Sequence, residues 1–113
     1  SDTGLFSVYF GTEKENLEKA LQIIFKEFQL LREKKLGTLQ LVKAKKQLIG
    51  QLAISSENRE DLMLTIGKSY LFYNKVDPLK TVSAKIEEIT AAQLLEVSNE
   101  ILDPGNMCRL IYY

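Results

Sequence analysis

One stretch, from Gly37 to Asn74, constrains the fold most, because its apolar residues recur with the period of an α-helix. Counting about 100° per residue from Leu48, the following members fall within roughly 40° of one line along the helix. They are Leu52, Ser55, Arg59, Leu62, Ile66, Tyr70 and Tyr73. The periodicity predicts one long helix at residues 39–73, capped by Thr38, in which Ser55 and Arg59 mark the place where a bend would occur.

Capping and turn signals divide the rest of the chain into three further helices. Thr12, with Glu15 three residues later, forms a capping-box pattern that predicts a helix at residues 13–35. Pro78 opens a short helix after Asn74, since proline fits the first helical position. Thr90 opens the last helix, which stops near Leu102 before a turn cluster at residues 103–106.

Two short segments are rich in aromatic and branched residues, as strands are. They are residues 5–10, LFSVYF, and residues 107–113, MCRLIYY. Because two strands alone make a marginal sheet in water, we expect part of the sheet to be missing. The predicted fold is an incomplete two-layer α+β domain in the order strand, helix, long helix, helix, helix, strand, with the helices on one face of a mainly antiparallel sheet. Gly50 and Gly67, inside the long helix, predict close backbone approach to a neighbour.

Composition sets the size and class of the protein. The chain has 113 residues, 45% of them hydrophobic and 27% charged, which predicts a single domain at residues 1–113. Lys plus Arg equals Asp plus Glu at 15 each, so the charge balance disfavours nucleic acid as a partner. No apolar run approaches the length of a membrane span, and we expect neither a span nor an export signal. A bacterial cytoplasmic and a periplasmic location both fit.

The chain contains no histidine, and this absence excludes most hydrolytic chemistry. Nucleophile and base pairs of the Ser/His or Cys/His type cannot form, and neither can a metal site that needs an imidazole. The one cysteine, Cys108, lies in an apolar run and is interpreted as a small buried side chain. We therefore assign no catalytic, cofactor-binding or metal-binding residue to this chain.

Polar candidates for a site have ordinary structural explanations. The cluster of Glu57, Asn58, Glu60 and Asp61 offers oxygen ligands, but on one helix it lacks the loop geometry of cation sites and is interpreted as solvent-facing charge. Arg59 lies on the apolar line of the long helix. Pairing with a carboxylate of a neighbouring helix, or snorkelling to solvent, is favoured there over contact with a substrate.

Aromatic residues gather at the end of the long helix and at both ends of the chain. Core packing is the preferred interpretation for all of them, and contact with another domain or partner is the alternative at the helix end and the C-terminus. The residues are Tyr70, Phe72 and Tyr73 on the helix, Phe6, Tyr9 and Phe10 on the first strand, and Tyr112 and Tyr113 at the C-terminus.

The order of several short segments resembles the C-terminal domain of the pitrilysin and insulinase-like zinc metallopeptidases. The segments are GLFSVYFGT at 4–12, NLEKAL at 16–21, LVKAKKQLIGQL at 41–52, REDLMLTIGKSYLFYN at 59–74 and KIEEITAAQLLEVSNEIL at 85–102. The resemblance covers essentially the whole chain. It identifies the chain as the C-terminal part of the non-catalytic second domain.

The resemblance implies a role in proteolysis without catalytic residues of its own. In the family, a zinc-bearing domain with an inverted H-x-x-E-H motif pairs with a related domain that lacks it, and the two enclose a peptide-binding chamber. The second domain contributes an Arg and a Tyr separated by six residues, but the positions seven after Arg32 and Arg59 are Leu39 and Ile66. That pair is expected upstream, and zinc in the other domain of the parent protein.

Three functions remain open from the sequence. The first is a structural, chamber-forming fragment of a zinc-dependent endopeptidase, whose partners are the zinc-bearing domain and a peptide or protein substrate. The second is the same domain in a non-enzymatic core or processing-partner subunit. The third is a free-standing helical interaction module. Exposed strand edges would allow the fragment to self-associate.

Overall fold

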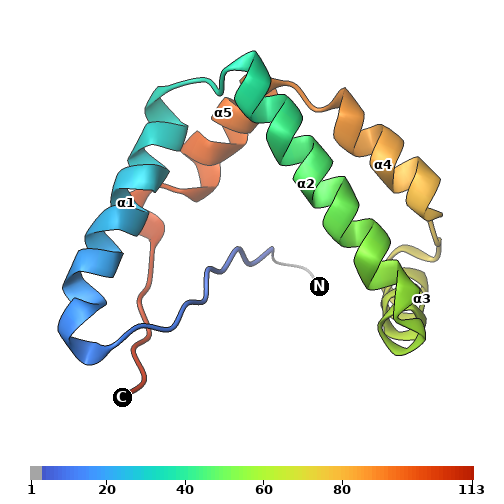
Figure 1. The fold of residues 1–113 in the computed structure, drawn as a ribbon, viewed down its shortest axis with the longest axis horizontal. Coiled ribbons are helices and arrows are strands. Elements are labelled where there is room, and N and C mark those ends of the chain that lie inside the picture. Colours follow the sequence, from blue (N-terminus) through green and yellow to red (C-terminus); the bar gives the residue numbers. More distant parts are fainter. Residues whose placement is uncertain (1–3) are drawn as a thin grey trace. The chain divides into compact units, whose positions relative to one another are not determined.

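The computed structural model describes residues 4–113 as helices joined by short connections (Figure 1). These residues form two compact units. The central unit contains residues 37–89, and the terminal unit contains residues 4–36 with residues 90–113. Each unit is described by itself below.

The central unit is built on α2 (Thr38–Glu57), which contacts both α3 (Arg59–Tyr73) and α4 (Leu79–Glu88). In Figure 1, α4 lies beside α2, and α3 continues from its C-terminal end. The least exposed stripe of α2 includes Leu41, Ile49 and Leu52 at helical spacing. Ile86 of α4, 8% exposed, is the most buried apolar residue of this unit, whose core is therefore small.

The predicted single helix at residues 39–73 is wrong, because Asn58 separates α2 from α3. Asn58 has φ −77° and ψ 109°, outside the helical region, and its side chain accepts hydrogen bonds from the backbone of Glu60 and Asp61. Just before it, the hydroxyls of Ser55 and Ser56 donate to backbone carbonyls within α2. Side chains that compete for backbone groups end one helix and cap the next. The interruption falls in the segment where the sequence placed a bend.

The connection from α3 to α4 follows the predicted boundaries closely. Asn74 ends α3 in the left-handed region at φ 49°, and its N–H donates to the carbonyl of Tyr70. Asparagine tolerates this conformation better than most residues and so makes a good helix end. Pro78 is the N-cap of α4, which therefore begins at Leu79, one residue later than predicted. Gly37 caps α2 in place of Thr38, and its N–H donates to the side chain of Gln40.

The terminal unit pairs α1 (Leu17–Glu33) with α5 (Ala91–Ile101). Short 3₁₀ turns, η1 (Lys14–Asn16) and η2 (Pro104–Asn106), precede α1 and follow α5. Leu21 of α1 and Leu102 after α5 are the buried apolar residues of this unit, Leu102 being 4% exposed. Ser98 is also buried, and its hydroxyl is satisfied by donating to the carbonyl of Leu94.

Helix starts in the terminal unit were predicted with mixed success. Thr90 and Gln93 form the predicted capping box, with Thr90 N–H bonded to Gln93 and Gln93 N–H bonded to Thr90. The predicted cap at Thr12 is wrong. The first turn is 3₁₀, α1 begins at Leu17, and no side chain caps either helix start there. Leu102 ends α5 as predicted.

The predicted α+β class is also wrong, since residues 4–113 contain helices and no strand. Residues 5–10 and 107–113 have strand-forming composition but make no sheet ladder with each other. A strand needs a paired neighbour for its backbone groups, and composition cannot supply one. The helical order between the two segments stands, apart from the interruption at Asn58.

Gly50 and Gly67 do not mark close packing, contrary to prediction. A Cβ atom added at either position would meet no atom of another element within 4 Å. The cost of glycine in these helices therefore has no packing explanation among the described residues.

No helix within residues 4–113 is long and apolar enough to cross a membrane.

Candidate functional site

The structure describes no ready-made metal site. Within residues 4–113, no group of three or more His, Cys, Asp or Glu side chains is placed to hold a metal ion. Residues of the acidic cluster at the α2–α3 junction instead stabilise the N-terminus of α3. Asn58 Oδ1 accepts the N–H groups of Glu60 at 3.1 Å and Asp61 at 3.4 Å, and the acidic side chains favour the N-terminus of α3.

Arg59 does not lie on a buried line as predicted; of the two favoured outcomes, its exposed side chain fits the one that reaches solvent. It is the first residue of α3 and is exposed to solvent. The interruption at Asn58 changes the phase between α2 and α3, so the apolar line calculated for one continuous helix does not pass through Arg59. Its side chain therefore has no need of a buried carboxylate partner.

The aromatic residues at the end of α3 are exposed, so the core-packing interpretation is wrong for them in this chain. Leu71 and Tyr73 are each 79% exposed, and Tyr70 and Phe72 are more than half exposed. Four consecutive positions at about 100° per residue point to every side of a helix. The last turn of α3 is thus apolar around its whole circumference, which is typical of a helix with neighbours on several sides.

The two terminal segments also expose their apolar side chains. Tyr9 is 91% exposed, and the other aromatic residues of these segments, Phe6, Phe10, Tyr112 and Tyr113, are exposed as well. Cys108, predicted to be buried, is exposed. The ammonium of Lys14 lies over the ring of Tyr113, 5.2 Å from the ring centroid. A contact of that kind is worth about 0.5–1 kcal/mol at an exposed site.

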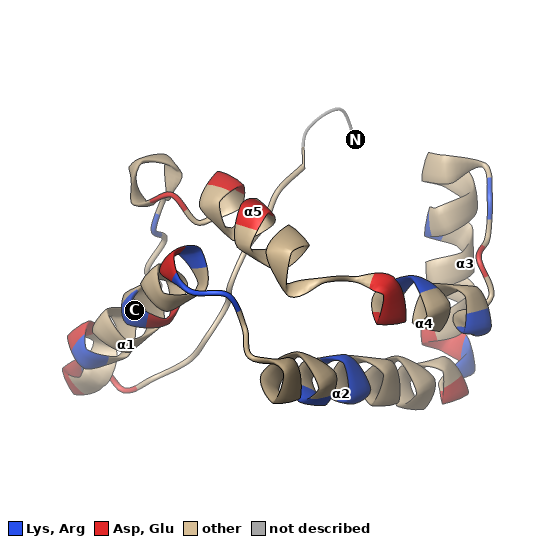
Figure 2. Ribbon diagram, turned by 90° about the horizontal axis from the view of Figure 1, so that it is seen from above, with Lys and Arg blue, Asp and Glu red and all other residues tan. Residues whose placement is uncertain are grey.

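A lysine side chain links two helices of the central unit. In Figure 2, Lys and Arg residues are seen along α2, where the sequence has Lys43, Lys45 and Lys46. Lys45 lies on the less exposed side of α2, and its Nζ donates to the carbonyl oxygen of Glu87 at 2.6 Å. Glu87 is in the last turn of α4, where a cation complements the free carbonyl groups and the helix dipole.

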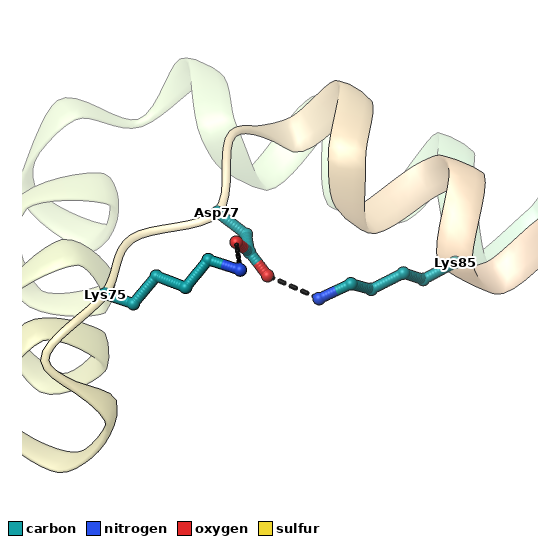
Figure 3. A network of polar contacts seen from close by, with 3 residues as sticks. All are labelled: Lys75, Asp77 and Lys85. Atoms are coloured by element: carbon teal, nitrogen blue, oxygen red, sulfur yellow. Dashed lines mark hydrogen bonds and ion pairs between the residues drawn. The ribbon is translucent and has the colours of Figure 1, made fainter.

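Asp77 holds two lysines in the connection before α4 (Figure 3). Its carboxylate oxygens lie 2.8 Å from Lys75 Nζ and 2.5 Å from Lys85 Nζ. Hydrogen bonds from Lys75 and then Lys85 hold the pKa of Asp77 below its ordinary value of 3.8. Both lysines are well exposed, so this network braces a loop and does not form an enclosed reactive site.

A cavity with one cation is the feature that sequence reasoning missed. It has a volume of about 210 Å³ and lies entirely within the terminal unit. Its lining residues come from α1 and from the segment after α5: Phe25, Phe28, Gln29, Arg32, Leu102, Pro104 and Met107. The Nε atom of Arg32 is buried and has no hydrogen-bond partner. No sequence signal marked it, because an arginine in the last turn of a helix is expected for the dipole alone.

Comparison with known proteins gives a family model and two curated relatives. The model of the Peptidase M16 inactive domain matches residues 1–48. An uncharacterized zinc protease of Rickettsia felis is 28% identical over 101 residues, which are 89% of this chain and 24% of that protein. An uncharacterized zinc protease of Streptomyces coelicolor is 28% identical over 102 residues, 90% of this chain and 22% of that protein. No solved structure matches at a comparable level of significance.

The two curated relatives agree in kind and in the extent of the match. The chain spans about a quarter of the length of the curated relatives it matches. The matching family model describes an inactive peptidase domain, which fits a non-catalytic fragment of a protease-like protein. Together, the family model and the two zinc-protease relatives support the similarity of this chain to the C-terminal domain of the pitrilysin-like M16 family.

Proposed function

We propose that this chain is a structural part of a zinc-dependent endopeptidase and forms one wall of its substrate chamber. The observation that carries the proposal is the match of residues 1–48 to an inactive peptidase domain. In this proposal, residues 1–113 belong to one domain, zinc and the cleavage chemistry come from another domain of the same protein, and the substrate is a peptide or protein.

The absence of histidine supports the assignment of zinc binding and cleavage to another domain. The zinc-binding motif of this family requires two imidazoles, and this chain has none. The chain is also acidic and basic in equal measure, with no strong field that would select a charged substrate over long distances. Its contribution would be shape and apolar contact.

The exposed apolar surface of α3 supports a structural role within something larger. The last turn of α3 presents Tyr70, Leu71, Phe72 and Tyr73 on all sides, and each of the four is more than half exposed. Leaving such residues in water forgoes about 1.5–3 kcal/mol for each large side chain that a neighbour would bury. Further domain structure packed on α3 would recover this free energy.

The experiment compares three preparations in a fluorogenic peptidase assay with added zinc: the longer protein, the longer protein lacking residues 1–113, and the chain alone. We expect turnover only in the first, with zinc content by mass spectrometry of metals unchanged in the second. Chelator-sensitive turnover by the chain alone, or undiminished turnover without it, would contradict the proposal.

A second function, a non-enzymatic assembly subunit, is equally compatible with the match to an inactive peptidase domain. The same assay separates the two functions. A longer protein that contains neither zinc nor peptidase activity, yet requires residues 1–113 to bind a related peptidase subunit, would support the assembly role.

A further inference from the structure

The cavity of the terminal unit combines apolar walls with a single cation. Phe25 and Phe28 of α1 and Leu102 and Met107 after α5 supply apolar lining, and Arg32 supplies the cation. The rings of Phe25 and Phe28 meet edge to face, with centroids 6.4 Å apart. At about 210 Å³ the cavity greatly exceeds the ~10–15 Å³ that one water molecule needs.

Arg32, which lines this cavity, has an unmet hydrogen-bond donor. Its Nε atom is buried and makes no hydrogen bond. A buried donor without a partner is unfavourable, and in native proteins water, a ligand or another chain segment usually completes it. Neither of the ion pairs found among residues 4–113 involves Arg32.

The backbone around Arg32 is fixed. The side-chain amide of Asn99 donates to the carbonyl oxygen of Arg32 at 2.9 Å and to that of Leu95 at 2.8 Å. The helix turn that carries the guanidinium is thus held against α5. A cation on a fixed backbone loses less conformational entropy when it binds a ligand than one on a mobile loop.

Two acidic residues that are adjacent in sequence to the lining residues Arg32 and Leu102 accept hydrogen bonds from other groups. The carboxylate of Glu33 accepts a hydrogen bond at 2.8 Å from Gln29, one turn earlier in α1. The carboxylate of Asp103 accepts the N–H of Gly105 at 3.0 Å and so shapes the turn after α5. Arg32 forms no ion pair with either of them, while the cavity that it lines has room for an anion.

We propose that this cavity binds a carboxylate carried on a short apolar stem, with Arg32 as the anchoring cation. The planar guanidinium offers parallel N–H donors that match the two oxygens of a carboxylate. The apolar lining would cover the stem. The shared chemistry is that of an acidic side chain of the longer protein and of a free short-chain carboxylate. This inference does not depend on the proposed proteolytic role.

The experiment follows arginine Nε–H signals of the chain by NMR during titration with sodium butyrate. Butyramide, its neutral isostere, and sodium chloride at equal ionic strength serve as controls. The chain has three arginines, and the exposed Arg59 and Arg109 are internal references for Arg32. The methyl signal of Met107 reports on the cavity, and that of the exposed Met63 on the surface.

We expect saturable shifts of Arg32 Nε–H and Met107 methyl with butyrate alone, at a dissociation constant on the order of 1–10 mM for so small a ligand. The affinity for butyrate measured at the Met107 methyl signal should fall at least about tenfold in Arg32→Lys, which keeps the charge but loses the planar guanidinium. It should be unchanged in Arg109→Lys. Equal shifts at all three arginines, or an equal response to butyramide, would overturn the proposal. Both of these outcomes can be observed in the unsubstituted chain, so the test does not depend on the folding of a variant.

The same titration on the longer protein distinguishes the two sources of the carboxylate. If Arg32 Nε–H is already at its bound position and ignores butyrate, an acidic side chain of the protein occupies the cavity. If the butyrate response is retained, the site takes a free carboxylate. An Arg32 Nε–H signal at its unbound position that butyrate cannot move would overturn the inference for the longer protein.

Discussion

The side chain of Asn99 bonds to the backbone carbonyl of Arg32, although the two residues are 67 positions apart in the sequence. Arg32 is in the last turn of α1, where carbonyl groups have no partner within the helix. One amide group therefore satisfies a free helix end and joins α1 to α5. It also fixes the turn that carries the cation of the cavity.

Replacing Asn99 by alanine should loosen the α1–α5 pair. The expected loss is about 0.5–1.5 kcal/mol of unfolding free energy, since one carbonyl returns to water and one long-range contact is removed. Denaturant unfolding followed by circular dichroism measures it, with the exposed Glu100→Ala as matched control on the same helix. Equal stability of the two variants would show that the bond contributes nothing.

The interruption between α2 and α3 should depend on the Asn58 side chain. In Asn58→Ala the N–H groups of Glu60 and Asp61 lose their acceptor, and we expect a loss of about 1 kcal/mol together with faster amide exchange at both residues. Asn58→Asp keeps an acceptor and adds favourable charge at the N-terminus of α3, so it should retain protection. Unchanged exchange in Asn58→Ala would contradict the capping assignment.

Local patterns predicted most of the helices, because capping residues and apolar stripes act within a few residues. The Thr90–Gln93 box and the left-handed Asn74 were readable for this reason, as was the α1 stripe that contains the buried Leu21. The continuous helix failed because its apolar period ran on through Asn58, and the period carries no information on whether one side chain will cap in mid-run.

The sheet and the sites required information that is not local. Residues 5–10 and 107–113 have the composition of strands, but only a partner fixes whether they pair. Exposed Cys108 and Tyr73 were placed inside on hydrophobicity, which says that a residue prefers burial and not that this chain provides it. The Arg32 cavity arises from helices that meet only in the folded chain.

Acid should weaken the loop between α3 and α4 through Asp77. Its pKa is lower in the folded protein than in the unfolded chain, so its ionisation stabilises the fold above about pH 3.9. This contribution is lost as the pH falls through the folded-state pKa. NMR titration of the Asp77 carboxyl carbon should show the pKa rising toward 3.8 in the double variant Lys75→Met, Lys85→Met. The exposed Lys80→Met is the control, and an equal rise there would rule out the specific pairs.

Lys45 should matter more to the central unit than its neighbour Lys46. Lys45→Met removes the hydrogen bond to the Glu87 carbonyl, and we expect a loss of about 0.5–1 kcal/mol with faster amide exchange in α4. Lys46→Met removes an equal charge from an exposed position of the same helix. If amide exchange in α4 becomes faster by the same factor in both variants, the loss of charge explains the effect. The hydrogen bond from Lys45 to the Glu87 carbonyl would then contribute nothing.

Leucine-to-alanine substitutions at two positions should separate the core of this chain from the surface that awaits a neighbour. Leu102 is 4% exposed and Leu71 is 79% exposed. In the chain of 113 residues, Leu102→Ala should cost about 2–3 kcal/mol, near the lower end for buried leucines because so small a core can collapse around the gap. Leu71→Ala should change the unfolding free energy by less than about 0.5 kcal/mol. In the longer protein, by contrast, the proposed packing on α3 buries Leu71, and its truncation should then cost more than about 1 kcal/mol. If Leu71→Ala changes the unfolding free energy negligibly in both proteins, α3 is exposed to solvent in the longer protein as well. In that case α3 does not form part of the chamber wall, and another helix would have to supply it.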